Sequence, residues 1–327
     1  MPAFIIHHIT RYLYDLPVID SANQIMLFPL QDEFQDVTEH TLAITGDPVV
    51  DLYADYYGNQ VGTFMHSRPH QELVIDVKME VVTQQRALPA IEHPIADQWN
   101  YLQQVADAIP YIDFVKQERF EALPEVAAVA NMEGSRDASV MDTAYRLMEY
   151  VYRNFEYNKE VTTVETTLDE IWRLKAGVCQ DFAHILLAML RMLGIPARYV
   201  SGYVCPHDAG MRGEGATHAW VEACIPFYGW LGFDPTNNCI ANEQHVRLAV
   251  GRNFTDCSPV KGTYRGTAHH RLEVGVSVAH EEESRTPAPV TTVLMPQPIA
   301  NNNGNGETTN SYRKHVEMMM QQQQQQQ

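Results

Sequence analysis

The chain contains 327 residues, of which 45% are hydrophobic, enough to bury the core of one large domain or of two ordinary ones. Its formal net charge of −18 argues against nucleic acid or an anionic membrane as a partner, because both would repel an acidic protein. The cysteines number five, and no two are separated by only two residues, so neither a zinc knuckle nor a disulfide framework is indicated. We expect a cytoplasmic protein, since no basic leader and no long apolar run is present. No cofactor is expected, and no metal either, because the adjacent histidines at His7-His8 and His269-His270 would point to opposite faces of a strand.

Residues 1–88 have the pattern of consecutive β-strands. Phe4, Ile6, Tyr12 and Tyr14 share one parity, which is typical of a strand with one buried face. Further short apolar runs follow, with turn residues between them. We predict an antiparallel β-sandwich or curled sheet that serves as a scaffold or orients the substrate.

Beyond residue 89 the pattern changes to a mixture of helix and strand. Apolar residues recur at helical spacing from Val140 to Val151, whereas the runs at 197–204 and 217–225 alternate as strands do. We predict a second domain over residues 89–282. The remaining residues, 283–327, are rich in Pro, Asn and Gln and are expected to be disordered.

Cys179 lies at the start of the most apolar helical stretch in the chain. The residues from 182 to 193 are apolar on most sides of a helix, and Gly194 followed by Ile195 and Pro196 is a stop signal. Free backbone N–H groups and the helix dipole favour an anion at the other end. A thiolate is such an anion, and the same N–H groups could hold an oxyanion. Position alone leaves open a buried structural thiol.

A nucleophilic thiol needs a base, and the base needs a group that orients it. The strand that begins at His218 is followed by a turn and by a returning strand that ends at Asp234. If Ala223 lies opposite Gly229 in this hairpin, His218 and Asp234 face one another directly; a shift of two makes them diagonal neighbours. Either register predicts a triad in which Cys179 attacks an amide, His218 is the base and Asp234 orients it.

Three stretches resemble the bacterial transglutaminase-like family, whose members are often described as cysteine proteases, and two N-terminal stretches resemble its β-domain. The three are GVCQDFAHILLAMLRMLGIPARYVSGYV, HAWVEACIPFYGWLGFDPTNN and HVRLAVGRNFTDCSPVKGTYRG; the N-terminal two are YLYDLPVIDSANQIMLFPL and DYYGNQVGTF. The resemblance implies an α+β fold with a papain-like core, in which a helix-borne cysteine packs on an antiparallel sheet. It places the nucleophile at Cys179, the base at His218 and the third member at Asp234.

Several other roles stay open. No side chain matches a dedicated oxyanion donor, so the backbone N–H of Cys179 is the default, with Trp172, Tyr199 or Gln180 as further candidates. Asp181 is expected to cap the helix, His184 to hydrogen-bond inside the core, and Glu222 to form an ion pair. The glycine-rich loop at 205–216 is either a lid or a plain connection.

The expected activity is acyl transfer from a peptide or protein amide substrate. Hydrolysis of the thioester by water is the leading hypothesis, because a cross-linking enzyme inside the cell would need tight control. One alternative is transglutaminase activity, in which an amine replaces water. Another is a non-catalytic peptide-binding module, which the presence of all three triad residues makes less favoured.

Overall fold

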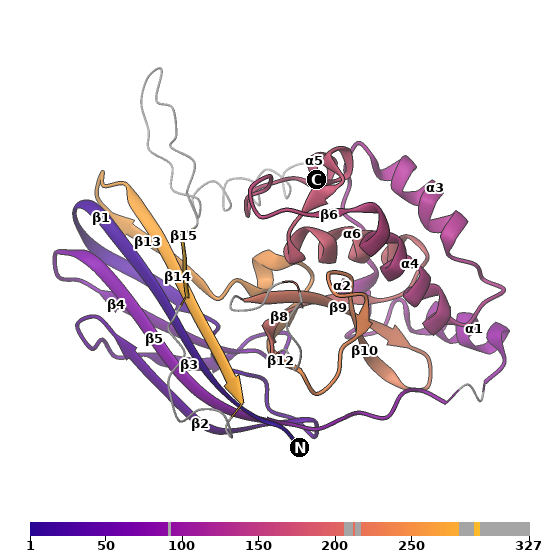
Figure 1. The fold of residues 1–327 in the computed structure, drawn as a ribbon, viewed down its shortest axis with the longest axis horizontal. Helices are drawn as coiled ribbons and strands as arrows, with labels where there is room; N and C mark the ends of the chain where they lie inside the picture. Colours follow the sequence, from indigo (N-terminus) through magenta and orange to yellow (C-terminus); the bar gives the residue numbers. More distant parts are fainter. Residues whose placement is uncertain (91–92, 206–211, 213–216, 281–290, 295–327) are drawn as a thin grey trace.

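A computed structural model describes residues 1–90, 93–205, 212, 217–280 and 291–294 of the chain. Figure 1 shows a large curled sheet on one side of the molecule and a group of helices on the other, with a smaller sheet between them. This arrangement confirms the expected α+β class, with a β-rich N-terminal part ahead of a mixed core.

The larger sheet is built around β1 (Ala3–Ile25). The first part of β1 pairs with β5 (His70–Thr83) and β14 (His270–His280), and its last part pairs with β4 (Gln60–His66) and β13 (Val260–Arg265). The outer strands are β2 (Gln35–Ile44), β3 (Asp51–Ala54) and β15 (Thr291–Leu294). Because β1 changes partners along its length, the sheet curls around its apolar face.

Two parts of this sheet differ from the domain boundaries expected from the sequence. Strands β13 and β14 fall in the range 89–282, yet both pair with β1. Strand β15 falls in the tail 283–327 that was expected to be disordered, and it pairs with β14; the rest of that tail lies outside the described residues. A strand pattern identifies a strand but not its partner, so pairing between distant segments could not be predicted.

The helical half is organised around α6 (Cys179–Met192), whose residues Phe182, Ile185 and Met189 are fully buried. Helix α4 (Val140–Asn154) packs its apolar stripe against α6. The other helices are α1 (Ile95–Val105), α2 (Ile112–Val115), α3 (Leu123–Glu133), α5 (Leu168–Leu174) and the short 3-10 helix η1 (Phe254–Cys257). Since α6 is surrounded by this packing, its first residue is held in a fixed place.

The smaller sheet has the strand order β11-β10-β9-β8-β12. Ala219, Val221 and Ala223 of β9 join the core formed with α6, whereas Trp220 packs in a separate cluster with Val200. The strands are β8 (Ala197–Val204), β9 (His218–Ile225), β10 (Gly229–Asp234), β11 (Cys239–Ile240) and β12 (His245–Gly251), and the parallel pair β6 (Glu156–Tyr157) and β7 (Ala176–Gly177) leads into α6.

The two halves are joined along β12 by amide side chains of the large sheet. Asn59 donates to the carbonyl of Val250 and accepts from its N–H, both at 2.8 Å. Gln35 makes the same pair of bonds with the backbone of Arg247, at 2.9 and 2.8 Å. These side chains form hydrogen bonds with backbone N–H and C=O groups at the edge of β12, as a neighbouring strand would.

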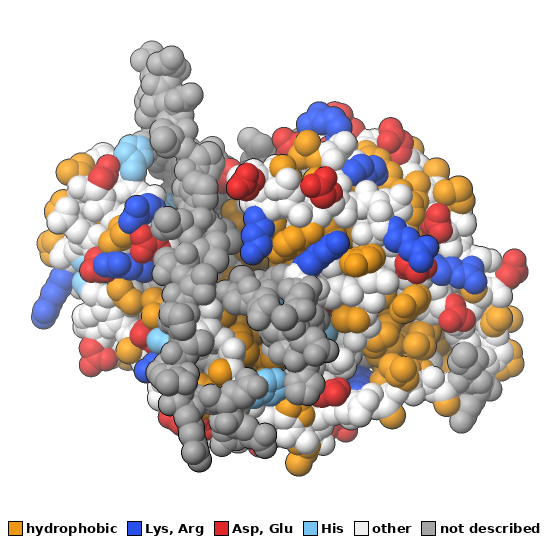
Figure 2. All heavy atoms as spheres, viewed as in Figure 1, with side chains coloured by type: hydrophobic (Ala, Val, Ile, Leu, Met, Phe, Trp, Pro, Cys, Tyr) orange, Lys and Arg blue, Asp and Glu red, His pale blue; other side chains and the backbone are white. Residues whose placement is uncertain are grey.

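The surface carries both signs of charge. In Figure 2, Lys and Arg side chains are scattered among Asp and Glu on the face viewed. Among the described residues, no helix is both long and apolar enough to cross a membrane.

Candidate active site

Cys179 is the first residue of α6, as the sequence predicted, and its side chain is partly exposed. Asp181 closes the first turn, because its Oδ2 accepts the N–H of Val178 at 2.8 Å and the hydroxyl of Thr162 at 2.6 Å. Gly177 lets this carboxylate fold back, since a Cβ there would collide with it. The thiol therefore sits at a rigid helix N-terminus, where an anion is favoured.

His218 and Asp234 form a buried hydrogen-bonded pair. Nε2 of His218 lies 2.8 Å from Oδ2 of Asp234, and both side chains are inaccessible to solvent. The strands pair with Gly229 opposite Ile225, a register shifted by two from the one that places Ala223 opposite Gly229. Asp234 and His218 are therefore diagonal neighbours, the second of the two arrangements considered from the sequence.

Asp234 accepts hydrogen bonds at both carboxylate oxygens. Oδ1 accepts the backbone N–H groups of Thr236 and Asn237 at 2.9 and 3.2 Å. Oδ2 accepts Nδ2 of Asn237 at 2.8 Å, in addition to His218, and lies 3.4 Å from Nε2 of His245. A carboxylate with so many donors stays ionised although it is buried.

The contact between His218 and Asp234 shifts their pKa values in opposite directions. Burial alone would lower the pKa of His218, but the charge and hydrogen bond of Asp234, with a smaller effect of Cys179, raise it to about 10. Burial alone would raise the pKa of Asp234, but His218 and His245 hold it well below its usual range. The carboxylate is thus charged at neutral pH, and the imidazole readily holds a proton.

Cys179 lies near the imidazole of His218. Nδ1 of His218 is buried and has no hydrogen-bonding partner at ordinary distance among the described residues, and Cys179 is close enough to contribute to the raised pKa of the imidazole. The structure therefore places Cys179 near the hydrogen-bonded pair of His218 and Asp234.

Two tyrosines lie near Cys179, and one of them had no clear signal in the sequence. Burial, followed by the nearby Cys179, raises the pKa of both Tyr157 and Tyr199. The guanidinium of Arg212 lies 5.9 Å from the ring centre of Tyr157. Tyr199 was one of the open oxyanion candidates, whereas another, Trp172, already donates to Glu125 at 3.0 Å. Tyr157 belongs to a two-residue strand, which is too short for a periodic pattern.

His245 is the main site residue that was not singled out. It begins the third stretch that resembles the family, but it lies on β12, which borders β8 rather than β10. Alternation within one hairpin could not place it beside Asp234. The one sequence feature that could have indicated His245 was its position at the start of a strand, after a short connection.

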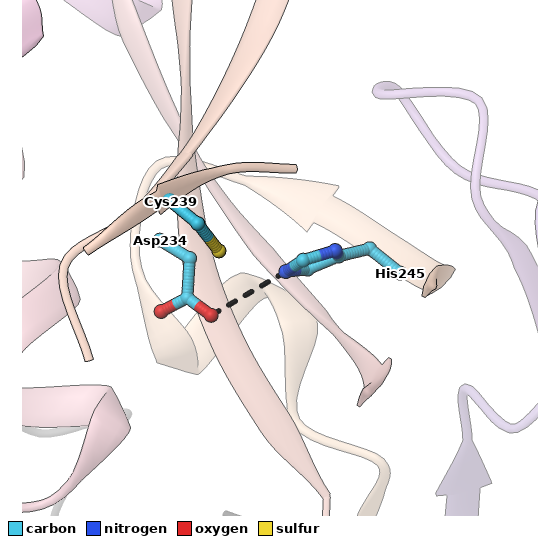
Figure 3. A group of neighbouring side chains, drawn as sticks. All are labelled: Asp234, Cys239 and His245. Atoms are coloured by element: carbon cyan, nitrogen blue, oxygen red, sulfur yellow. Dashed lines mark hydrogen bonds and ion pairs between the residues drawn. The ribbon is translucent and has the colours of Figure 1, made fainter. Parts of the chain in front are cut away.

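In the part of the chain that the structure describes, Asp234, Cys239 and His245 form the group of side chains that could hold a metal ion. Their ligand atoms lie within 4.8 Å of one another and point toward a common centre (Figure 3). However, the oxygens of Asp234 already accept several hydrogen bonds, and burial, with the charge of Asp234, raises the pKa of Cys239 to about 12. The hydrogen bonds of Asp234 therefore account for its position beside His245 without a metal ion.

The other expected roles agree with the contacts. Glu222 is buried and accepts Nε of Arg198 at 2.7 Å, with Arg247 at 3.8 Å. His184 accepts the backbone N–H of Phe254 at 3.1 Å within the core. The loop at 205–216 lies mostly outside the described residues.

Two family descriptions match separate parts of the chain. Residues 127–235, which include Cys179, His218 and Asp234, match the transglutaminase-like superfamily core. Residues 4–82 match the bacterial transglutaminase-like N-terminal region. The matches follow the order of the large sheet and the helical core.

Relatives match the chain over most of its length or over the core alone. An uncharacterized protein of Mycobacterium leprae is 31% identical over 275 residues, which cover 83% of this chain and 96% of the relative. A protein-glutamine gamma-glutamyltransferase of Pseudomonas aeruginosa is 33% identical over 97 residues, 28% of this chain and 14% of that protein. The crystal structure of a "Putative Cysteine Protease" from Cytophaga hutchinsonii has a TM-score of 0.66 at 21% identity, covering 88% of this chain and 93% of the other, which shows a shared fold.

Proposed function

The chain belongs to the bacterial transglutaminase-like family, and from this premise we propose that it is a cysteine-dependent acyl-transfer enzyme that hydrolyses a peptide or amide bond. The observation that carries the proposal is the placement of His218, whose Nε2 meets Asp234 at 2.8 Å, while Nδ1 has no other partner among the described residues and Cys179 lies near the ring. An imidazole held between a thiol and a carboxylate is the arrangement that activates a cysteine nucleophile.

In the first half of the reaction, the sulfur of Cys179 attacks the amide carbonyl and Nδ1 of His218 takes the thiol proton. The carbonyl oxygen becomes an oxyanion, which the backbone N–H of Cys179 at the start of α6 is placed to bind. When the intermediate collapses, the C–N bond breaks and the imidazolium gives its proton to the departing amine. A thioester on Cys179 remains.

In the second half, His218 accepts a proton from water, and the resulting hydroxide attacks the thioester. The C–S bond breaks, the acid is released, and the proton on His218 returns to the sulfur. Asp234 holds Nε2 of His218 as a donor through both halves, so Nδ1 remains the nitrogen that exchanges the proton.

Alkylation by iodoacetamide over a range of pH tests this proposal without knowledge of the substrate. Cys179 is expected to react faster at neutral pH than an ordinary thiol, as mapped by mass spectrometry. Cys179→Ala should abolish the fast phase, and Cys239→Ser, which removes the other partly exposed thiol, should retain it. If Cys179 reacts no faster than a free thiol, the proposal is wrong.

A glutamine peptide then separates the two acyl acceptors. Hydrolysis predicts ammonia release and a gain of about 1 Da per glutamine, with or without a primary amine. Transglutaminase activity, which shares the thioester, predicts formation of the amine adduct instead. Failure of the peptide in both reactions while Cys179 still reacts rapidly would point to a different amide substrate.

A further inference from the structure

His245 approaches the carboxylate of Asp234 from outside the proposed triad. It is the first residue of β12, is 5% exposed, and directs its ring toward Asp234 (Figure 3). Its Nε2 lies 3.4 Å from the same Oδ2 atom that accepts His218. One carboxylate oxygen therefore serves two imidazoles.

The chemistry of the carboxylate determines which partner donates. Nδ1 of His245 lies 3.3 Å from both the backbone N–H and Oδ1 of Asn242, so this nitrogen has a partner whether or not it carries a hydrogen. An ionised carboxylate can only accept hydrogen bonds. In the contact with Asp234, Nε2 of His245 is therefore the donor.

His245 also supports the ring that lies behind the catalytic base. Trp220 contacts His245 edge to face, with ring centres 5.2 Å apart. The same Trp220 lies nearly parallel to His218, with ring centres 6.1 Å apart and an interplanar angle of 27°. Removal of His245 would loosen both neighbours of His218, the carboxylate and the indole.

His245 also lines a cavity whose walls come from both halves of the molecule. The cavity has a volume of about 70 Å³, and its lining includes Gln35 and Thr83 of the large sheet together with Trp220 and His245. That volume has room for roughly two water molecules. Among the described residues that line it, neither Asp234 nor His218 is present.

We propose that His245 is a positioning residue, which holds the carboxylate of Asp234 toward His218 and separates this pair from the water of the cavity. The inference rests on the proposed function, since it assigns His245 to the support of that reaction. Its chemical role is exerted through Asp234, and it needs no contact with the substrate.

The consequence is a change in the protonation of His218. The groups that face His218 are Asp234 on β10, Cys179 on α6 and His245 on β12. Water admitted beside Asp234 raises the local dielectric and weakens its attraction for the imidazolium. The pKa of His218 should then fall from about 10 toward the ordinary value of 6.5.

Three substitutions separate the two tasks of the side chain. His245→Gln keeps both volume and an N–H donor, His245→Leu keeps volume alone, and His245→Ala keeps neither. His8→Gln is the matched control, because His8 is another buried histidine with two hydrogen bonds, to Tyr203 and Thr10, in the large sheet. Thermal unfolding identifies the variants that fold.

The first readout is the titration of His218 by NMR in a Cys179→Ser background. The midpoint should fall by at least about one pH unit for His245→Ala, by less for His245→Leu, and least for His245→Gln, with His8→Gln unchanged. If the folded Leu and Gln variants both titrate like the parent, the proposal is overturned, even where their thermal stability is reduced, because a purely structural role predicts lower stability alone.

The second readout is alkylation of Cys179 by iodoacetamide, which ties the inference to the reaction. On the acid side of the profile, the rate should fall ~10-fold for His245→Ala, matching one pH unit, and His245→Gln should recover most of it. If Cys179 of the parent is alkylated no faster than a free thiol, the proposed function is refuted. If Cys179 is alkylated rapidly in the parent and at the same rate in the His245 variants, only the role of His245 is refuted. The NMR arm decides the role of His245 in either case.

Discussion

Two buried histidines, one in each half of the molecule, have pKa values shifted in opposite directions. His8 in the large sheet bonds to the hydroxyls of Tyr203 and Thr10, and burial, with a smaller effect of His7, lowers its pKa to about 4. His218 in the smaller sheet is equally buried, but its carboxylate partner raises its pKa to about 10. Burial alone makes an imidazole neutral, and only an ionised neighbour reverses that effect.

The comparison shows what distinguishes a structural histidine from a base. Hydroxyl partners satisfy His8 without favouring either charge, so it remains a neutral part of the core. Asp234 favours the imidazolium, which is the species formed when a thiol gives up its proton. Each of the following substitutions changes the charge or the partner of one buried group.

The largest effect is expected for Asp234→Asn, which should make His218 resemble His8. With no charge opposite it, burial should lower the pKa of His218 below 6.5. We expect the rate of Cys179 alkylation at neutral pH, and the rate of amide hydrolysis, to fall by a factor of roughly 10³. NMR titration of His218 measures the first change and kinetics the second; an unchanged titration would contradict the comparison.

The same substitution predicts a change in pH-dependent stability. The raised pKa of His218 gives stability that is complete below its unfolded value of 6.5 and is lost as the pH approaches 10. The lowered pKa of Asp234 gives stability that is present above 3.8 and is lost at lower pH. In denaturant unfolding, the difference between parent and Asp234→Asn should therefore be largest between about pH 4 and 6.5 and shrink toward pH 10.

The next effect concerns a buried ion pair on the same strand that does not involve His218. Glu222→Gln leaves Arg198 without its charged partner at 2.6 to 2.7 Å, which should reduce the free energy of unfolding by on the order of 3 kcal/mol. Since Glu222 does not contact the triad, the pH profile of Cys179 alkylation should stay within the error of the parent. A shifted profile would show that charge anywhere on this strand tunes His218.

A smaller effect is expected for His8→Gln, seen only in acid. Because the pKa of native His8 is about 4, the unfolded chain binds a proton below pH 6.5 that the native chain refuses. The parent should lose up to ~3 kcal/mol of stability from this group between pH 6.5 and 4, and the Gln variant should lose less over that interval. Urea unfolding at pH 7 and pH 4.5 gives the two slopes, and equal slopes would show that His8 is protonated in the native state.

The sequence was sufficient where one local period determined geometry. Alternation on β9 and β10 put His218 and Asp234 on one face, and the apolar run after Cys179 put the thiol at a helix start. It was insufficient where contacts depend on partners far apart in the chain. His245 reaches Asp234 from β12, and β14 pairs with β1, because tertiary packing rather than local pattern selects such neighbours.

The smallest effect is expected at a second carboxylate beside the site. Asp181 is buried like Asp234, but its partners are an N–H and a hydroxyl rather than an imidazole, and burial outweighs both so that its pKa is raised. Asp181→Asn keeps an acceptor for the N–H of Val178, and because the raised pKa favours the protonated side chain near pH 4, the substitution should cost about 1 kcal/mol or less at that pH. A raised native pKa means that the parent loses stability as the pH rises through it, whereas the amide does not. In urea unfolding, the difference in the free energy of unfolding between parent and variant should therefore be smaller at pH 7 than at pH 4. A larger difference at pH 7 would mean that Asp181 is ionised and stabilised in the native chain, as Asp234 is.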